Sequence, residues 1–313
     1  MTEQGGALRI SYCVLCRPAL ITLVVSVVVM GLSARCLPGQ SSATETPSAA
    51  SRVTTLLPSG DVFRAPIADP REPRFHQSVV QIHGGSLASR VWLTDHGESI
   101  GLLRRENASR QSAMQFGVLV AKFAQLDLDT ESNDLVNADY MIGFPLTFRR
   151  GPLTGRVSLY HVSSHLGDEY LIASNRERVN VSFETLDARL SREWGSWRVY
   201  GGGNLVVRRS PKDLLAAAAH GGVEHRGVRY GRAVFANGIV YPVAAVDISA
   251  PGSQSGGARF SAKAGVELTS NRSSGAAGRS MSVLGEYFSG PSQFGQFYRE
   301  RIRFAGLALQ FTL

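Results

Sequence analysis

The sequence predicts an all-β fold, an antiparallel transmembrane β-barrel of about twelve strands (range about 10–14) that follows an N-terminal signal peptide and a linker. Three observations predict it. Apolar and polar residues alternate over long stretches, the connections alternate between short and long, and the alternation continues to the C-terminus.

The alternation is clearest in two stretches. Every second residue from Tyr140 to Phe148 is apolar, and Phe260 to Leu268 repeats the pattern. A soluble β-sandwich shows the same period of two, but its strands are usually about 5–6 residues long, whereas a membrane strand needs about 9–11. The length of these stretches therefore favours the membrane.

The expected strands and loops follow from this pattern. Strands are predicted at residues 86–94, 98–104, 112–123, 139–149, 154–164, 178–193, 197–207, 220–229, 238–249, 258–269, 279–289 and 299–313. The short connections are 150–153, 194–196, 230–237 and 271–278, and the longer ones are 124–138, 165–177, 208–219, 250–257 and 290–298. An even strand number puts both ends in the periplasm and the long loops outside the cell.

Two further patterns agree with an outer-membrane barrel. Aromatic residues cluster at strand ends, at Trp194 and Trp197 and at Phe294, Phe297 and Tyr298, as in interfacial girdles. Apolar residues at alternate positions from Leu307 to Leu313 resemble the C-terminal signal read by the barrel-assembly machinery.

The N-terminus predicts export. Residues 1–43 form the signal peptide and cleavage region, with the apolar run Ala19–Leu32 and a cut after Ala34 or Ala43. A lipoprotein at Cys36 and an uncleaved anchor are the alternatives. Residues 44–74 are expected to be a flexible linker or periplasmic N-terminal segment, and residues 75–313 the barrel. All three cysteines precede the mature chain, which suits an oxidising periplasm.

The charge suggests lipid and not nucleic acid as a partner. The formal net charge is +8, but the arginines alternate with apolar residues and form no basic run. A Gram-negative outer membrane, with its lipid and lipopolysaccharide, is the expected environment. The sequence leaves the oligomeric state open.

Several longer segments carry a family resemblance: Ala68-Asp-Pro-Arg-Glu-Pro-Arg-Phe75, Asp127-Leu-Asp129, Asn137-Ala-Asp-Tyr140, Tyr160-His-Val-Ser-Ser-His-Leu-Gly-Asp-Glu169 and Trp197-Arg-Val-Tyr-Gly-Gly-Gly203. From about Phe75 to Pro211 the chain resembles domain of unknown function family 1207, an uncharacterised bacterial family. The resemblance implies a membrane β-barrel and assigns no activity.

The segment Tyr160–Glu169 holds the densest set of reactive side chains. His161 and Ser163 lie two apart on a predicted strand, on the face expected to meet lipid, and a His that accepts the proton of a Ser activates it as a nucleophile. Outer-membrane phospholipase A and the outer-membrane lipid A deacylase look similar here, since both use His-x-Ser and an orienting polar residue on the next strand. Asn175, Asn180 and Glu184 are the candidates for that third residue.

The same pair has a second interpretation. A β-bulge would turn both side chains into the lumen, and the shift from Val179, Val181 and Phe183 to Leu186, Ala188 and Leu190 indicates such a phase change one strand later. Even outward-facing, His161 could simply bind lipid phosphate.

Acidic residues in two adjacent loops are candidate Ca²⁺ ligands, because Ca²⁺ takes six to eight oxygen ligands. Solvated loop carboxylates are the alternative, and no cofactor is firmly expected. The residues are Asp127, Asp129, Glu131, Asp134, Asp168 and Glu169.

A basic set, Arg299, Arg301 and Arg303, lies on one face of the last strand. Facing the lumen it would favour anionic solutes, and facing outward it would contact lipid A phosphates. The sequence therefore favours a structural, pore-forming or ligand-binding barrel, with a serine hydrolase acting on lipid acyl esters as the alternative.

Overall fold

Twelve antiparallel strands close into a barrel. The computed structural model describes residues 52–87, 89–107, 109–227, 230–232, 238–251, 257–270 and 279–312. The barrel strands are β2 (Phe75–His83), β3 (Arg90–Asn107), β4 (Ser112–Asp127), β5 (Leu135–Arg150), β6 (Leu153–Leu166), β7 (Val181–Trp194), β8 (Trp197–Ser210), β9 (Ala217–Arg226), β11 (Gly238–Pro251), β12 (Arg259–Ser270), β13 (Ser280–Pro291) and β14 (Arg301–Thr312). The predicted signal peptide, with its three cysteines, lies outside the described residues.

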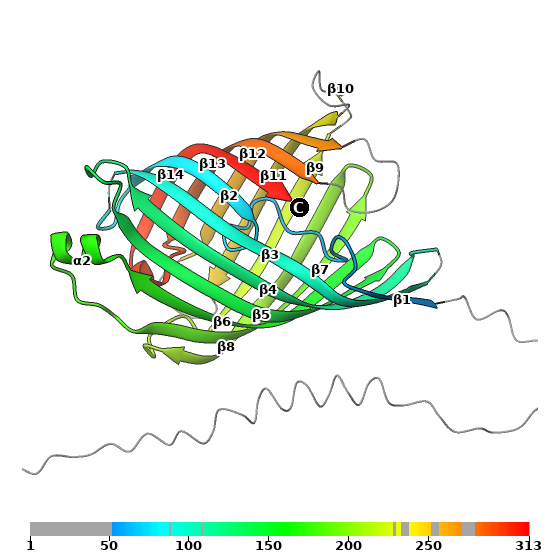
Figure 1. The fold of residues 1–313 in the computed structure, drawn as a ribbon, viewed down its shortest axis with the longest axis horizontal. Helices are drawn as coiled ribbons and strands as arrows, with labels where there is room; N and C mark the ends of the chain where they lie inside the picture. The colour runs from blue at the N-terminus through cyan, green and yellow to red at the C-terminus, as the bar shows by residue number, and fades with distance from the viewer. Residues whose placement is uncertain are drawn as a thin grey trace, which may run out of the picture. The chain divides into compact units, whose positions relative to one another are not determined.

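Each barrel strand pairs with its neighbours along the chain, and β14 pairs with β2 to close the wall. Two short strands, β1 (Arg52–Leu56) and β10 (Tyr230–Arg232), pair only with β3 and β11. Helix α2 (Asp168–Ser174) lies at one end of the barrel, called here the loop end, and β1 at the other, the turn end (Figure 1). No described helix has the length and apolar character needed to cross a bilayer.

The twelve strands confirm the predicted fold, although two predicted strands are placed differently. Residues 90–94 and 98–104 belong to the single strand β3. The polar run Asp95-His96-Gly97 between them interrupts the apolar pattern and made one strand look like two. The shift in pairing with β4, between Gly101 and Leu103, lies within the second stretch. Strand β2 was not predicted, because its outward face carries Gln77 and Gln81 among apolar residues.

Alternation gives the wall an apolar outside and a polar inside. On β14, Leu307 and Leu309 are exposed on the outer face while Gln310 is buried inside. The buried polar residues Arg156 and Lys263 likewise face the lumen. The lumen is therefore filled largely by charged and polar side chains.

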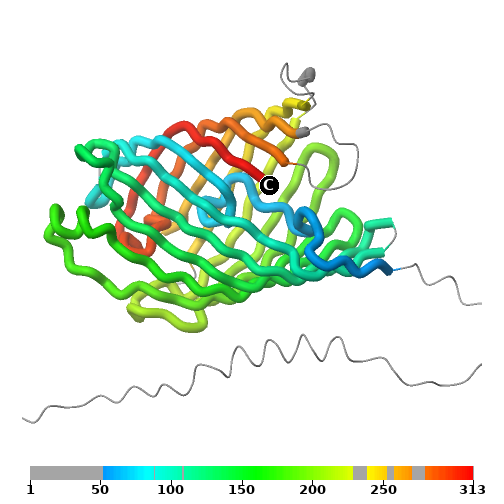
Figure 2. The backbone as a smooth tube through the Cα atoms, viewed as in Figure 1, coloured from blue at the N-terminus to red at the C-terminus, as the bar shows by residue number. Residues whose placement is uncertain are grey.

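Residues 57–74, called here the inner segment, lie inside the lumen and connect β1 to β2 (Figure 2). Their side chains and carbonyls bond to strands all around the wall. Ion pairs join Asp69 to Arg189 at 2.6 Å and Arg71 to Asp139 at 2.9 Å, and Glu72 accepts two bonds from Arg156. From Arg52 onward, the expected flexible linker is instead ordered: its prolines prevent regular structure, but its charges find partners in the lumen.

The connection between β13 and β14 also folds inward. It contains the 3-10 turn η2 (Gly295–Phe297), and Phe294 and Phe297 are buried among apolar residues of the lumen. These two aromatics were expected in an interfacial girdle, and that expectation is wrong. Trp194 and Trp197, at the tight turn between β7 and β8, are exposed on the outside, as a girdle requires.

Candidate functional site

His161 and Ser163 lie on the outer face of β6. Their neighbours Val162 and Ser164 are buried inside, while Val157, on the same face as His161, is exposed. The β6–β7 pairing runs without a register shift from Leu153 to Ser164. The inverted arrangement is therefore not adopted, and the only irregularity nearby lies between β7 and β8, beside Glu184.

Glu184 is the candidate third residue that contacts His161. It lies directly opposite His161 on β7, and its Oε1 is 3.2 Å from the imidazole Nδ1. The His161 side chain is 41% exposed and that of Glu184 24%. Asn175 ends helix α2 in the left-handed conformation, and Asn180 precedes β7 in an exposed position. Neither asparagine has a described hydrogen bond to His161.

The three side chains lie where the outer surface changes from apolar to polar. Toward the turn end, the surface of β5, β6 and β7 is apolar, with exposed Ile142, Phe144, Val157, Leu186 and Leu190. Toward the loop end it carries Tyr140 and Ser182, which pair with Ser163 from either side. Tyr140 also stacks near His165, with 6.0 Å between ring centroids. In a bilayer such a boundary lies near the headgroups.

His161 and Ser163 lie close together on this face but are not hydrogen-bonded to each other. The described residues include no hydrogen bond between His161 and Ser163, and Arg208 lies 3.8 Å from the carboxylate of Glu184. Residues two apart on a strand are separated by about 6–7 Å, so rotation of the imidazole can bring its Nε2 to the hydroxyl. Catalytic hydrogen bonds are often long before substrate binds.

The acidic residues of the two loops are not brought together. Asp129 binds the side chain of Arg90 at 2.8 Å, Asp168 binds Arg178 at 2.8 Å, and Asp134 accepts a bond from Ser132. The bonds from Arg90 hold the pKa of Asp129 below its usual range. None of Asp127, Asp129, Glu131, Asp134, Asp168 and Glu169 belongs to the one described group of three potential metal ligands.

That group is Asp69, His220 and Asp247, buried in the lumen. Its atoms already bond to one another or to neighbours: His220 Nε2 lies 2.6 Å from Asp247, and Asp69 lies 2.6 Å from Arg189. The guanidinium of Arg189 occupies the side of Asp69 that an incoming cation would need. The group is therefore better explained as an ion-pair network.

The three arginines of the last strand separate. Arg303 is exposed on the outer face of β14, the arrangement that was expected to contact lipid phosphates. Arg301 is also exposed, but its guanidinium lies beside Gly257 and lines the cavity in the lumen. Arg299 precedes the strand and binds Asp213 at 2.7 Å. Arg299 instead joins two loops at the loop end.

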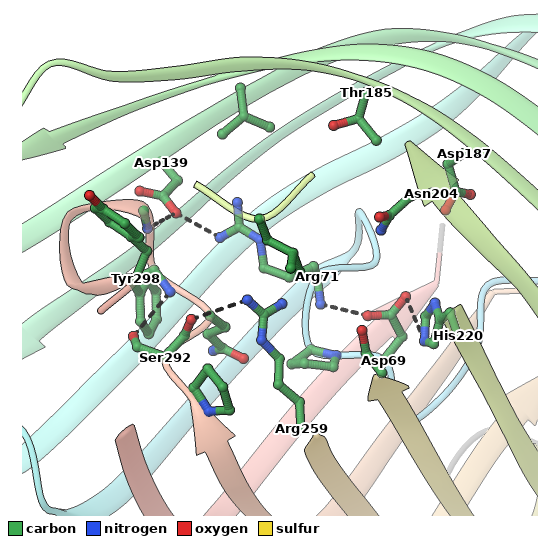
Figure 3. Close-up of a pocket in the computed structure, with 18 of the residues that line it drawn as sticks. Asp69, Arg71, Asp139, Thr185, Asp187, Asn204, His220, Arg259, Ser292 and Tyr298 are labelled. Carbon is green, nitrogen blue, oxygen red and sulfur yellow. Dashed lines mark hydrogen bonds and ion pairs between the residues drawn. The ribbon is translucent and has the colours of Figure 1, made fainter. Parts of the chain in front are cut away.

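The lumen contains a cavity of about 470 Å³ between the inner segment and the loop end. Figure 3 shows Asp69 and Arg71 of the inner segment facing Arg259, His220 and Asp139 from the wall. Sequence reasoning missed this site, because its residues come from distant segments. The sequence signal that could have indicated the cavity was the presence of polar residues at inward-facing positions near the loop end of several strands.

Solved structures share the fold. The chain is similar to the outer membrane phospholipase (OMPLA) of Salmonella typhi, a dimer with bound calcium, at 12% identity and a TM-score of 0.51 over 81% of this chain and 94% of that one. Outer membrane phospholipase A from Escherichia coli matches at 13% identity, a TM-score of 0.46 and coverages of 78% and 93%. The β domain of the Bordetella autotransporter BrkA matches at 15% identity and a TM-score of 0.39, over 77% of this chain and 97% of that one.

No curated protein matches the sequence. A family model does: the one described as "Protein of unknown function (DUF1207)" matches residues 32–313, nearly the whole chain. The resemblance inferred from the segments between Ala68 and Gly203 is confirmed, and the match extends through β14. The chain belongs to the DUF1207 family.

Proposed function

We propose that this protein is an outer-membrane hydrolase that cleaves acyl esters of membrane lipids, with Ser163 as nucleophile, His161 as general base and Glu184 as the residue that orients His161. The observation that carries the proposal is the contact between His161 Nδ1 and Glu184 Oε1 at 3.2 Å on the lipid-facing surface, beside an outward-facing serine.

The contact selects the protonation state that catalysis needs. A carboxylate at Nδ1 favours the tautomer with the proton on Nδ1, which leaves Nε2 free to accept a proton. Glu184 also stabilises the imidazolium that forms next. Polar residues on the lipid-facing wall add nothing to packing against lipid, so their grouping at one place favours a chemical role.

The reaction proceeds in two balanced steps. Ser163 Oγ attacks the ester carbonyl as His161 Nε2 takes the hydroxyl proton, and collapse of the tetrahedral intermediate expels the alcohol, which receives that proton. Water, deprotonated by His161, then attacks the acyl-serine, releases the fatty acid and restores the hydroxyl.

The position of the three residues suits an ester substrate. The ester groups of a lipid lie between its acyl chains and its headgroup, and the three side chains lie at the corresponding change of surface. The solved barrel with a TM-score of 0.51 is a phospholipase with bound calcium, so calcium belongs in the assay. The carboxylates of the acidic loop residues, from Asp127 to Asp134 and at Asp168 and Glu169, remain candidate calcium ligands under this proposal.

The same proposal places the protein in the environment predicted from its sequence. The signal peptide would direct export, the barrel-assembly machinery would insert the chain, and lipopolysaccharide and phospholipid would surround it. Arg303, exposed on the outer face of β14, would contact lipid phosphates there.

The test is acyl release from phospholipid and from lipid A by the mature protein, refolded in detergent, with calcium or with a chelator. Ser163→Ala should lower the rate by at least about 10³-fold, as loss of a serine nucleophile does. Ser182→Ala is the matched control, because Ser182 lies directly opposite on β7 and also faces outward.

Two outcomes contradict the proposal. Equal rates in the wild type and Ser163→Ala would exclude the nucleophile. A wild-type protein without acyl release, folded and supplied with calcium, would leave the non-enzymatic barrel as the function.

A further inference from the structure

The cavity in the lumen contains two arginines that face each other. Arg71 enters from the inner segment and Arg259 from β12, and Figure 3 shows both side chains extending toward the middle of the cavity. Each guanidinium donates a hydrogen bond that holds it in place. Arg71 donates to Asp139 at 2.9 Å, and Arg259 donates to the carbonyl of Ser292 at 3.4 Å.

Arg259 lacks the carboxylate partner that three other lumen-facing arginines have. Among the described residues, Arg74 and Arg104 also bond only to neutral groups, but neither lines the cavity. Arg156 is paired with Glu72, Arg189 with Asp69 and Asp187, and Arg198 with Glu224. Within the described residues, the only hydrogen bond of Arg259 is the long one, at 3.4 Å, to the neutral carbonyl of Ser292. Its positive charge is therefore not neutralised by a carboxylate in contact with it.

The nearby carboxylates are already engaged. Asp139 accepts bonds from Arg71, Asn137, Ser164 and the backbone N–H of Gly295, so its charge is shared among four donors. Asp247 accepts bonds from the hydroxyl of Tyr200 and from His220, each at 2.6 Å. Neither carboxylate is left to balance Arg259.

Two like charges that face each other in a site enclosed by protein repel, because the surroundings screen them less than water does. An anion between them removes the repulsion and gains hydrogen bonds from both guanidinium groups, whose planar donors suit carboxylate and phosphate oxygens. The arrangement is therefore better suited to an occupied cavity than to an empty one.

Other features of the cavity fit an organic anion. Thr185 Oγ1, Ser158 Oγ and Gln293 Oε1 line the cavity, are buried and have no partner among the described residues. Phe183 and Phe288 add apolar surface to the wall. The volume of about 470 Å³ lies within the usual range of about 300–1,000 Å³ for small-molecule sites.

We infer that the lumen binds a small organic anion, with its carboxylate or phosphate group between Arg71 and Arg259. Tyr298 and Arg299 line the cavity from the loop between β13 and β14, so the ligand enters from the loop end. This site lies on the opposite side of the wall from Ser163 and does not depend on the proposed hydrolase activity.

The test uses the mature protein refolded in a non-ionic detergent, titrated calorimetrically with three related probes. Phenyl phosphate and benzoate carry the two candidate anionic groups, and benzylamine carries a positive charge on the same ring. We expect at least one anion to bind at least about ten-fold more tightly than benzylamine, and the tighter of the two identifies the preferred group.

Variants then locate the binding. Arg259→Gln should weaken anion binding at least about ten-fold, because a charge-assisted contact is replaced by a neutral one. Arg259→Lys keeps the charge and should retain part of the affinity. Arg192→Gln is the matched control, because Arg192 is an exposed arginine near the turn end of β7. The shift in mobility between heated and unheated samples on a denaturing gel reports folding.

Three results would overturn the inference: anions that bind no better than benzylamine, an affinity unchanged by Arg259→Gln in a folded barrel, or an equal loss in Arg192→Gln. If Arg259→Gln does not fold, the comparison of the anions with benzylamine on the wild type and on Arg259→Lys still decides.

Discussion

The two faces of β6 and β7 contrast in how they satisfy polar groups. On the inner face, Arg156 and Asp187 belong to an extended network of ion pairs with the inner segment. On the outer face, one short chain of contacts joins His161, Glu184 and Arg208 at the edge of an apolar surface. Inside, the same two strands therefore carry an extended ion-pair network beside the unpartnered hydroxyls of Ser158 and Thr185, and outside they carry a nearly isolated polar group.

This difference distinguishes charged residues that stabilise the fold from charged residues that are candidates for catalysis. The buried charges of β6 and β7 have partners of opposite charge, because an unpaired charge in a poorly hydrated interior is costly. The outer group gains no comparable stabilisation, since exposed ion pairs contribute about 0–1 kcal/mol. Its grouping is better explained by function, and the predictions below test each half of this contrast.

The largest expected effect comes from removing the inner segment. A chain that begins at Phe75 lacks β1 and residues 57–74, so the ion pairs with Asp139, Arg156 and Arg189 are lost and the lumen gains water. We expect ion conductance in planar bilayers to rise several-fold over the full mature chain. A folded truncated barrel with unchanged conductance would show that wall side chains alone close the lumen.

Glu184→Gln tests the outer face. Glutamine keeps the shape but removes the charge that stabilises the imidazolium, and it can favour the wrong tautomer of His161. If the proposed hydrolysis occurs, its rate should fall by about 10²–10⁴-fold. Glu177→Gln, in the exposed segment between α2 and β7, is the control and should leave the rate unchanged. Equal rates in both variants would remove Glu184 from the mechanism.

Glu72→Ala tests the inner face. The substitution leaves the buried guanidinium of Arg156 without its main partner, and Arg189 loses a second contact at 3.5 Å. Breaking a buried pair in this way costs about 3–5 kcal/mol of unfolding free energy. Denaturant unfolding in lipid vesicles measures it, and acyl release by the folded fraction should not change. A loss below about 1 kcal/mol would mean that water replaces the pair.

These contrasts show what the sequence can and cannot predict. Strict alternation along β5 and β6 placed His161 and Ser163 on the outside, because each second residue must share a face. Strand β2 escaped prediction, since its outer face carries glutamines, and β3 was divided because the polar run Asp95-His96-Gly97 interrupts its apolar pattern. Local pattern predicts a strand only while the pattern is unbroken.

Contacts between segments that are distant in the chain could not be predicted from the sequence. The choice of Glu184 over Asn175 and Asn180 depends on the register between β6 and β7, which sequence spacing does not determine. The prolines of the inner segment indicated a linker, whereas its charges bond to β5, β6 and β7. The role inferred for Arg259 likewise depends on Arg71, which lies near it only because the barrel closes around the inner segment.

The smallest expected effect is at the loop end, where Asp213 joins Arg299 and Tyr298. Hydrogen bonds from Arg299 and then Tyr298 lower the pKa of Asp213 below its usual range, although the carboxylate is exposed. A carboxyl group whose pKa is lower in the folded state stabilises the fold above its unfolded pKa, and that contribution is lost as the pH falls through the folded value. Asp213→Asn should therefore leave the melting temperature at pH 7 nearly unchanged, because solvent screens the pair, and should reduce the loss of stability between neutral and strongly acidic pH only slightly. Thermal melts of both proteins across that pH range measure the difference. A large destabilisation at pH 7 would mean that this exposed contact holds the inward-folded loop in place, and the contrast between paired interior charges and weakly coupled exterior ones would then fail at the loop end.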